Sequence, residues 1–393
     1  MGVPAAVLLR GRDHRDRALP GQPRPRPSGG GEHHVPRQPV RRRDHARRLR
    51  RRGDDGADRR TPDRRRRHGK ARSPVNEVSL HLSVVLPSYR RLGRLPALIA
   101  AYTEQGADEV LIVLDGPHPG WEAALGALPP RARVMELPQN VGLALARIAG
   151  LRAITGDVVL TVDDDVEPGP GLVDRHRRFH ATLTDRVLLG YMPVALPSRR
   201  GADDAATYLY ARDYEAQARV WRSSDSDTIL GSLWGGNVSL PRVLYERAEA
   251  SRPSARLDYN EDLDLGLRLR DLGATAHFDE AARATHHHAR DLSGFLAESE
   301  TRGAAVAELE RRWGSRPPQL TPLVEVPSDY SRLLAAAARR ISERDGGGLL
   351  LGLCTGAYRA AGACRAWRAQ DAAARFLRRA LAMRGYRKAG ARS

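Results

Sequence analysis

The chain has 393 residues, of which 41% are hydrophobic, and it carries a formal charge of +18. This length and two cysteines exclude a disulfide-stapled miniprotein and allow two or three domains with sizeable cores. The low cysteine content favours a reducing compartment, so we expect a cytoplasmic protein. The charge is concentrated in residues 1–78, which hold 23 Lys and Arg against 9 Asp and Glu, compared with 42 against 38 in the remainder.

The N-terminal segment, residues 1–78, is rich in Arg, Pro, Gly, Asp and His and has almost no aromatic residues. Its few apolar side chains cannot offset the entropy of ordering it, so we predict a disordered basic arm. It is an arm attracted to RNA or membranes, a solvated linker, or a segment that is not translated in the native protein. We favour the third interpretation, with a start at Val75 or Val78, because the composition is typical of GC-rich DNA without coding pressure.

From His81 on, short apolar runs alternate with longer amphipathic segments, which is typical of a layered α/β domain with a mostly parallel sheet. Helical patterns at 95–103 and 141–154 fill two of the gaps between strands. Ligands in such sheets bind at the carboxyl ends of strands, so the residues after each strand are candidates for a site. Five strands are predicted, at 82–86, 109–114, 133–137, 158–162 and 187–194.

Polar residues follow the first four strands. A single acid in such a place is most often a turn or helix-capping residue, but four suitable ends in order indicate a ligand site. These ends hold Pro87, Ser88 and Tyr89, then Asp115, then Asn140 before a helix that carries Arg147, and finally Asp163, Asp164 and Asp165.

The three aspartates at 163–165 directly follow an apolar strand. Alternate side chains of an extended segment share a face, so Asp163 and Asp165 project together. Carboxylates this close repel unless a cation or hydrogen-bond donors compensate, and hard divalent cations prefer carboxylate oxygens. We therefore favour a metal or nucleotide site here over a structural turn, which stays the alternative.

A second motif begins with Trp234, Gly235, Gly236 and Asn237. Paired glycines permit a ligand to approach the backbone more closely than a Cβ would allow, although such pairs are also common in turns. The aromatic ring of Trp234 offers a flat apolar face on which a ligand could pack.

The third motif, at 260–270, has alternating leucines that by periodicity alone would fit a strand. The ends of the segment predict a helix instead, because Asn260 is a good N-cap residue and Gly273 stands where a helix would stop. Glu261, Asp262 and Asp264 then occupy the first turn. Acids are also common there because they interact favourably with the helix dipole, which is the alternative interpretation.

Three histidines, His286, His287 and His288, end a short strand-like segment. Three imidazoles in a row provide a candidate metal ligand whichever face of the strand points inward. Surface imidazoles in a basic loop are the alternative.

In this order and spacing, the motifs resemble those of the family 2 inverting glycosyltransferases, which have the GT-A fold. The resemblance covers roughly residues 81–300. It implies a Rossmann-like domain with a mostly parallel central sheet, in which Asp163 faces a nucleoside and Asp165 holds a divalent cation, Mn²⁺ or Mg²⁺. It also places a histidine beside the metal-binding aspartate, for which we choose His286, with His288 as second choice.

The same resemblance implies that Asp262 is the general base that removes a proton from an acceptor hydroxyl, with Glu261 as the runner-up. The implied donor-binding residues are Pro87, Tyr89, Asp115, Asn140, Arg147, Asp163 and Asp164. The implied acceptor-binding residues are Trp234, Gly235, Gly236 and Asn237.

Two departures from the family pattern qualify these roles. The family usually has Arg-Asn in the helix after Asn140, whereas Arg147 is followed by Ile148.

Processive members have spanning helices and a Gln-x-x-Arg-Trp motif, but Leu309 stands where the glutamine should be. The longest late apolar run, 346–364, is broken by Arg359 and is too short to span a membrane. We therefore expect a soluble or peripheral protein that transfers one sugar per encounter.

The C-terminal region is rich in Ala and Arg, and amphipathic patterns predict helices at 330–341 and 360–383. A helical appendage is the preferred interpretation, and attachment to an anionic membrane surface is the alternative. The predicted organisation is a basic arm at 1–78, a GT-A domain at 79–314 and a helical region at 315–393.

We thus predict a metal-dependent inverting glycosyltransferase that moves one sugar from a nucleotide-diphosphate donor to an acceptor hydroxyl. The acceptor is a saccharide, a lipid-linked glycan or a natural product, and the location is cytoplasmic or peripheral to the inner face of the membrane. A sugar nucleotidyltransferase is the nearest alternative, but no Gly-rich basic loop follows the first strand. A nucleic-acid-binding protein that acts through the arm and an inactive sugar-binding protein are the others, and the near-neutral body argues against nucleic acid.

Overall fold

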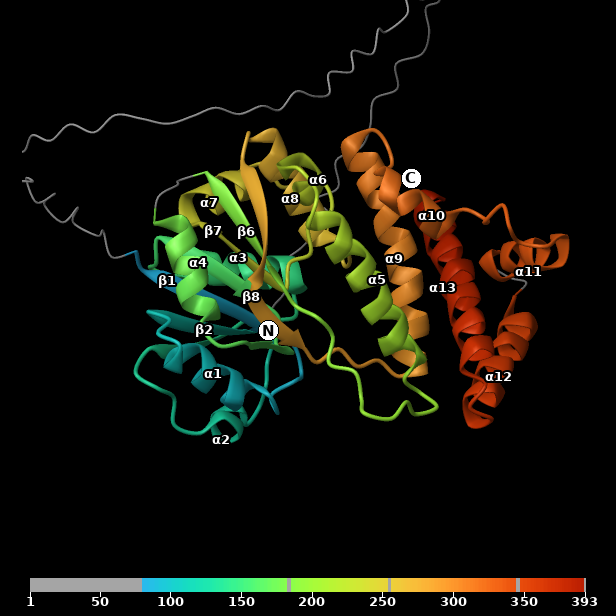
Figure 1. Ribbon diagram of the computed structural model, residues 1–393, viewed down its shortest axis with the longest axis horizontal. Helices are drawn as coiled ribbons and strands as arrows, with labels where there is room; N and C mark the ends of the chain where they lie inside the picture. Colours follow the sequence, from blue (N-terminus) through green and yellow to red (C-terminus); the bar gives the residue numbers. More distant parts are fainter. Residues whose placement is uncertain (1–79, 182–184, 254–255, 344–346, 392–393) are drawn as a thin grey trace, which may run out of the picture. The chain divides into compact units, whose positions relative to one another are not determined.

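The computed structural model describes residues 80–181, 185–253, 256–343 and 347–391 (Figure 1). The predicted basic arm at 1–78 lies outside these residues. The domain boundaries given above stay a prediction.

The described chain contains an eight-stranded sheet in the order β3-β2-β1-β4-β7-β6-β8-β5. Its strands are β1 (Leu82–Ser88), β2 (Glu109–Leu114), β3 (Ala132–Glu136), β4 (Val158–Val162), β5 (Val166–Pro168), β6 (Arg186–Tyr191), β7 (Asn237–Pro241) and β8 (Thr275–His286). The first four strands are parallel, as are β6 and β8. β7 is antiparallel to both β4 and β6, and β5 is antiparallel to β8.

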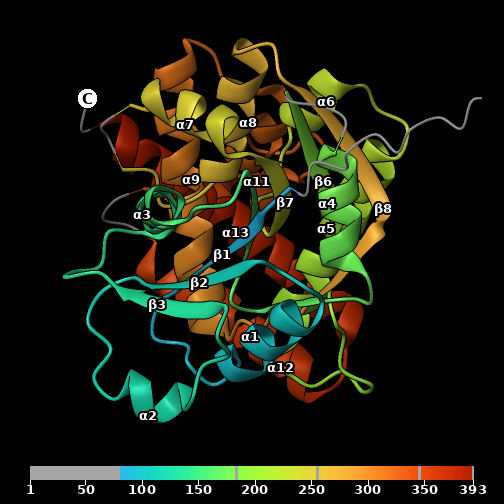
Figure 2. The same ribbon diagram turned by 90° about the vertical axis from the view of Figure 1, so that its left-hand side faces the viewer.

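Helices cover both faces of this sheet. They are α1 (Leu95–Glu104), α2 (Trp121–Leu125), α3 (Leu143–Ala153), α4 (Leu172–His180), α5 (Ala205–Trp221), α6 (Ser226–Leu230), α7 (Arg242–Ala250), α8 (Glu261–Asp271), α9 (Leu292–Trp313), α10 (Thr321–Val324), α11 (Arg332–Ser342), α12 (Gly348–Ala363) and α13 (Trp367–Gly390), with a 3₁₀ turn at Pro318–Leu320. α1 and α3 lie on opposite faces (Figure 2). The chain moves outward from β1 to β3 and then returns to β4, so right-handed crossovers place α3, before β4, on the face opposite α1. The reversal between β1 and β4 marks where such sheets bind ligands.

The core forms around the central strands. β1 and β4 are buried along their whole length, as expected for uninterrupted apolar runs in a parallel sheet. The predicted α/β fold with a mostly parallel sheet and C-terminal helices is therefore confirmed. Of the five predicted strands, those at 109–114 and 158–162 match β2 and β4, whereas β6 ends at Tyr191, three residues earlier than predicted.

The predicted helix after Asn260 is confirmed as α8. Its start differs from the expectation in one respect. Asn260 adopts a left-handed conformation with φ of 58° and its side chain makes no capping hydrogen bond. Asparagine tolerates this region better than most residues. Asn260 therefore contributes its backbone conformation to the turn before α8 and not a side-chain cap.

The C-terminal helices differ from the single helix predicted at 360–383, and that prediction is wrong. Arg365 has φ of 56°, which interrupts the helical path between α12 and α13. α13 then packs along α9 (Figure 1). A Cβ at Gly303 or at Gly385 would collide with a backbone oxygen of the facing helix, of Ala382 and Glu300 respectively, so the two backbones touch. Within the described ranges, no helix is long and apolar enough to cross a membrane.

Candidate active site

A cavity of about 950 Å³ opens at the carboxyl ends of β1 and β4. Its walls come from strand ends, from the start of α8, and from α5, α9 and α13. Of the predicted site residues, it is lined by Pro87, Tyr89, Asp115, Asp163, Asp164, Asp165, Trp234, Glu261, Asp262 and His286. The structure therefore brings together residues that lie up to about 200 positions apart in the sequence.

Asp164 and Asp165 share one cation, the guanidinium of Arg91. Arg91 Nη1 lies 2.8 Å from Asp165 Oδ2, and Nη2 pairs with Asp164. Asp164 also accepts a hydrogen bond from Ser88 Oγ at 2.7 Å. Burial raises the pKa of Asp164 to about 6, against the opposing effect of Arg91. Arg91 was not among the predicted site residues, although it directly follows Pro87, Tyr89 and Arg90 in the loop after β1.

Asp165 also faces His286, whose Nε2 lies 3.1 Å from Asp165 Oδ1. Although burial acts to raise it, the pKa of Asp165 is held below its usual range by His286 and Arg91. β5 and β8 pair antiparallel here, with Val166 opposite His286. This pairing holds Asp165, which precedes Val166, and His286 at the same edge of the sheet. The ring of Tyr210 stacks on that of His288 at 3.9 Å between centroids and closes this end of the cavity.

These residues fit a divalent cation in part. A carboxylate and an imidazole are suitable ligands for Mn²⁺, and Nδ1 of the buried His286 has no hydrogen-bond partner among the described residues. The described residues contain no group of three or more His, Cys, Asp or Glu side chains placed to hold a metal. Asp165 and His286 thus suit a cation that takes its remaining ligands from substrate and water.

Asp115 is buried and lies at the end of β2. Its Oδ1 accepts the backbone N–H of Val141 at 2.7 Å. Its Oδ2 accepts the backbone N–H of Gly142 at 2.9 Å and the side-chain Nδ2–H of Asn140 at 2.8 Å. Asp115 and Asn140 therefore hold the loop before α3 to the end of β2. Asn140 thus helps to hold this loop in place but does not itself line the cavity.

Arg147 lies buried on α3 between two acids. Its Nη2 donates to Asp163 Oδ1 at 2.6 Å and its Nη1 to Glu261 Oε1 at 3.1 Å. The end of β4 and the start of α8 are joined through this single guanidinium. Both of its terminal nitrogens are engaged, so Arg147 organises the two acids and does not reach freely into the cavity.

The adjacent acids Glu261 and Asp262 occupy the first turn of α8. Burial raises the pKa of Glu261 to about 7, with a further contribution from the charge of Asp262 and an opposing one from Arg147. Burial also raises the pKa of Asp262, again opposed by Arg147. Asp262 Oδ2 accepts the backbone N–H of Gly235 at 2.9 Å, which ties the glycine motif to the acid pair. Carboxylates with raised pKa values in a cavity are suited to exchange protons near neutral pH.

The glycine motif is needed for this close approach. A Cβ on Gly235 would lie 3.0 Å from Arg147 Nη1, and one on Gly236 would lie 2.8 Å from Asp163 Oδ2. Trp234 lines the cavity and packs on Tyr210 at 5.5 Å between ring centroids. Asn237 differs from the expectation, because its fully buried amide contacts His176 Nε2 and the backbone oxygen of Ala282. No atom of Asn237 is exposed to contact an acceptor.

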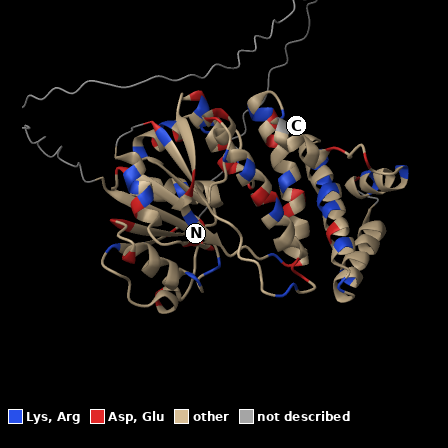
Figure 3. Ribbon diagram, in the orientation of Figure 1, with Lys and Arg blue, Asp and Glu red and all other residues tan. Residues whose placement is uncertain are grey.

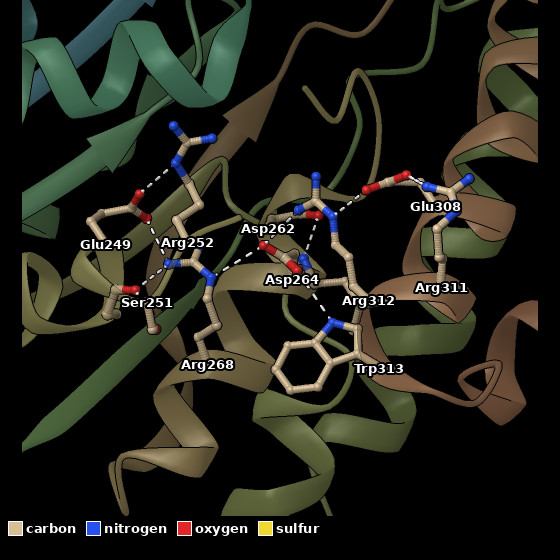
Figure 4. Close-up of polar contacts among 12 residues, drawn as sticks. Glu249, Ser251, Arg252, Asp262, Asp264, Arg268, Glu308, Arg311, Arg312 and Trp313 are labelled. Carbon is tan, nitrogen blue, oxygen red and sulfur yellow. Dashed lines mark hydrogen bonds and ion pairs between the residues drawn. The ribbon is translucent and has the colours of Figure 1, made fainter. Parts of the chain in front are cut away.

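A polar cluster behind the acid pair surrounds Asp264 (Figure 4). Asp264 is buried and accepts hydrogen bonds from Arg268 Nε at 3.1 Å and from Trp313 Nε1 at 3.2 Å. Arg312 Nη1 lies 3.2 Å from the same carboxylate. The Arg-Trp pair at the end of α9 thus anchors α8 two residues after Asp262.

The helices of the C-terminal half also line the cavity, which was not predicted. They contribute Asp213 from α5, Glu298 and Arg302 from α9, and Arg378 and Arg379 from α13. No local signal marks these residues, because each lies on an amphipathic helix where an arginine or acid is ordinary.

Residues 83–226 match the family model described as Glycosyl transferase family 2. This part of the chain belongs to glycosyl transferase family 2. The resemblance to this family is thus confirmed, whereas the motifs at 234–237, 260–270 and 286–288 lie outside the matched residues. The sheet order and the switch between β1 and β4 agree with the GT-A fold expected of a glycosyltransferase domain.

Two curated glycosyltransferases are similar over part of their length. The chain is 34% identical to an N-acetylglucosaminyltransferase from Mesorhizobium japonicum over 111 residues, 26% of this chain and 26% of the relative. It is 26% identical to an undecaprenyl-phosphate 4-deoxy-4-formamido-L-arabinose transferase from Aeromonas hydrophila subsp. hydrophila over 181 residues, 40% of this chain and 53% of the relative. The chain thus spans only part of the length of the curated relatives that it matches.

Among solved structures, a mannosyltransferase from Pyrobaculum calidifontis in complex with GDP-Man and Mn²⁺ is similar to this chain. It has a TM-score of 0.49 and 18% sequence identity, and the match covers 79% of this chain and 88% of that chain.

Proposed function

We propose that this protein is a metal-dependent inverting glycosyltransferase that moves one sugar from a nucleotide-diphosphate donor to an acceptor hydroxyl. The observation that carries the proposal is the link from Asp163 through Arg147 to Glu261. It joins the strand end where α/β sheets bind nucleotides to a buried acid pair at the same cavity.

The donor would lie against the ends of β1 and β4. Pro87, Tyr89 and Asp163 line this part of the cavity, and Asp115 and Asn140 hold the adjoining loop. Asp164 and Arg91 complete the wall. The aromatic ring suits stacking on a nucleobase, and the carboxylates suit the N–H and O–H donors of a nucleoside, whereas a diphosphate needs the positive charge of Arg91 or of a cation.

Asp165 and His286 would hold a divalent cation, which neutralises negative charge on the departing diphosphate when bound. Arg91 already supplies positive charge beside Asp165. The same loop residue would therefore be well placed to face the diphosphate once a cation binds the carboxylates.

Asp262 would act as the general base and remove the proton of the acceptor hydroxyl as it attacks the anomeric carbon from the side opposite the leaving group. Burial raises its pKa, and Gly235 fixes one of its oxygens through a backbone hydrogen bond. Glu261 is the alternative base. Its Oε1 is held by the cation of Arg147, whereas the two oxygens of Asp262 accept only backbone N–H groups, those of Gly235 and Leu263. Trp234, beside Gly235, would pack on the acceptor.

The acceptor is a saccharide, a lipid-linked glycan or a natural product, and a membrane-borne acceptor has specific support. Leu333 on α11 and Leu349 on α12 are 84% and 83% exposed. α11 also carries Arg332, Arg339 and Arg340, and basic helices with exposed leucines bind anionic membrane surfaces. The apolar side of α13 is buried. We therefore assign contact with the inner face of a membrane to α11 and α12, in a protein otherwise located in the cytoplasm.

A thermal-shift screen with UDP-, GDP- and dTDP-sugars tests the proposed function without an acceptor. One donor should raise the melting temperature in the presence of Mn²⁺ or Mg²⁺, because a ligand that binds only the folded state stabilises it. EDTA and Asp165→Ala should each abolish this shift. Asp174→Ala, which removes an exposed acid on α4, should leave it unchanged. A metal-independent shift would remove the cation from the proposal, and the absence of a shift with every donor would contradict donor binding.

A further inference from the structure

Both signs of charge line the cavity. Most of the acids come from the strand ends and from α8, whereas α9 and α13 contribute three arginines, beside Glu298 of α9 and Asp213 of α5. Of these arginines, Arg302 and Arg378 interact with Tyr259, close to the acid pair. Figure 3 shows the basic stretches along α13. A sugar hydroxyl alone has no need of such a wall.

Arg302 has no acid in direct contact among the described residues, and unlike Arg379, which donates to the backbone oxygen of Glu325, it has no other hydrogen-bond acceptor there. Among the described residues, its side chain makes no ion pair and no hydrogen bond, and its Nε is buried without a partner. The guanidinium lies 5.0 Å above the ring of Tyr259. Buried donors in proteins are normally satisfied, so an unpaired guanidinium at a cavity wall indicates that a ligand completes it.

Arg378 lies beside Arg302 and reinforces the positive charge. It pairs with Asp213 of α5, which is itself 37% exposed and so only partly neutralises it. Burial lowers the pKa of Arg378, Asp213 opposes this effect, and the nearby charge of Arg302 lowers the pKa further. Asp213 and Glu298 also lie within electrostatic range of Arg302, but neither forms an ion pair with it among the described residues. One further anion between the two guanidiniums would contact both of them.

The position of Arg302 separates this wall from the donor side. Tyr259, on which Arg302 packs, precedes Glu261 by two residues, so the guanidinium lies next to the start of α8. The ring of Tyr210 stands on His288 and packs on Trp234, between the aspartates of 163–165 and the C-terminal helices. An anion at Arg302 would therefore belong to the molecule that meets Asp262.

We propose that Arg302 and Arg378 form a subsite for an anionic group of the acceptor, a phosphate or a carboxylate. This inference rests on the proposed function. Arginine forks bind both groups with two parallel hydrogen bonds, which would orient the acceptor as well as hold it. The acceptor is then a phosphorylated or acidic molecule, either soluble or displayed on a lipid.

The test measures binding of glycerol 3-phosphate, with glycerol as the uncharged control, to the full chain by calorimetry in the absence of any donor. Glycerol 3-phosphate should bind and glycerol should not. Arg302→Gln should weaken the binding roughly tenfold or more, which is typical of a lost charged hydrogen bond. Arg302→Lys should retain part of it, and Arg378→Gln should weaken it as well. Arg178→Gln, at an exposed arginine of α4, is the matched control and should change nothing.

A second arm separates a soluble acceptor from a lipid-borne one. Vesicles of phosphatidylcholine with phosphatidic acid are compared with vesicles of phosphatidylcholine alone, for the wild type and Arg302→Gln. A phosphatidic-acid preference that depends on Arg302 supports a lipid-borne phosphate, and Arg302-dependent binding of glycerol 3-phosphate only supports a soluble acceptor. The melting temperature of each variant shows that it is folded.

Three results would overturn the inference. These are no binding of either probe, binding that Arg302→Gln and Arg378→Gln leave unchanged, and displacement of glycerol 3-phosphate by a nucleotide sugar together with weaker donor binding in Arg302→Gln. The last would assign the arginines to the donor diphosphate. A failure of nucleotide sugars to bind the wild type would instead contradict the proposed function, since the phosphate measurement contains no donor.

Discussion

Arg147 and Asp163 form an ion pair of 2.6 Å between α3 and the end of β4, and the guanidinium side chain is only 6% exposed. The same guanidinium reaches Glu261, so one buried cation serves two acids from segments about 100 residues apart in the sequence. Such a residue sets the mutual position of the end of β4 and the acid pair of α8.

Replacing Arg147 with methionine should therefore destabilise the protein strongly. The change leaves Asp163 and Glu261 without their shared cation, and removal of one member of a buried ion pair typically costs about 3–5 kcal/mol in the free energy of unfolding. Chemical denaturation measures this loss. Arg178→Met, at a pair exposed on α4, should cost less than about 1 kcal/mol. A similar small loss for Arg147→Met would show that the acids find other partners.

Replacement of Asp262 and replacement of Glu261 should have different effects on the rate of transfer. Asp262→Asn keeps the size of the side chain but cannot accept a proton at neutral pH, so transfer should fall by roughly 10² to 10⁴ with donor affinity retained. Glu261→Gln should reduce transfer less. The rate of transfer and the donor dissociation constant are measured for both variants. A normal rate for Asp262→Asn with an inactive Glu261→Gln would reverse the roles, and two active variants would place the base elsewhere.

Stability should depend on pH through Glu261. Its pKa is about 7 in the folded protein because it is buried, whereas an exposed glutamate has an ordinary value near 4.5. The folded state therefore binds more protons between these values, and the contribution of Glu261 to stability is lost as pH rises from about 4.5 to about 7. Denaturation at several pH values should show a shallower fall for Glu261→Gln than for the wild type. Equal slopes would mean that Glu261 stays charged in the folded state.

Deleting residues 1–74 should leave the melting temperature and the activity unchanged, because the sequence of this segment offers too few apolar side chains to contribute to a core. Thermal denaturation of the full and shortened chains measures this. A clear fall on deletion would make the arm structural. Salt-sensitive RNA binding that disappears with the deletion would instead support the nucleic-acid interpretation.

The sequence predicted those parts of the site that are local. Apolar runs of Val, Ile and Leu identified β2 and β4, and the polar residues after them proved to line one cavity, since parallel strands bring their carboxyl ends to the same edge. The first-turn acids and Gly273 identified α8 against the competing strand periodicity. These signals lie within a few residues of the structure they specify.

The remaining parts of the site depend on long-range packing. Arg302 and Arg378 look like ordinary surface positions of amphipathic helices, and only the packing of α9 and α13 brings them to the cavity. Asp115 matched a ligand pattern, but its oxygens are engaged by the loop before α3. The break at Arg365 was missed because alanine-rich sequence on both sides is equally favourable for a helix.

The backbone contact of α9 with α13 at Gly303 and Gly385 has a consequence for how acceptor preference could change in evolution. Gly303 adjoins Arg302, so the main chain, through two positions that lack a side chain, sets the distance between the helices that carry Arg302 and Arg378. Neither helix can slide along the other without a collision. If Arg302 and Arg378 bind the acceptor as proposed, substitutions at these two positions could change acceptor preference during evolution, while the glycine contacts keep the spacing of α9 and α13 unchanged.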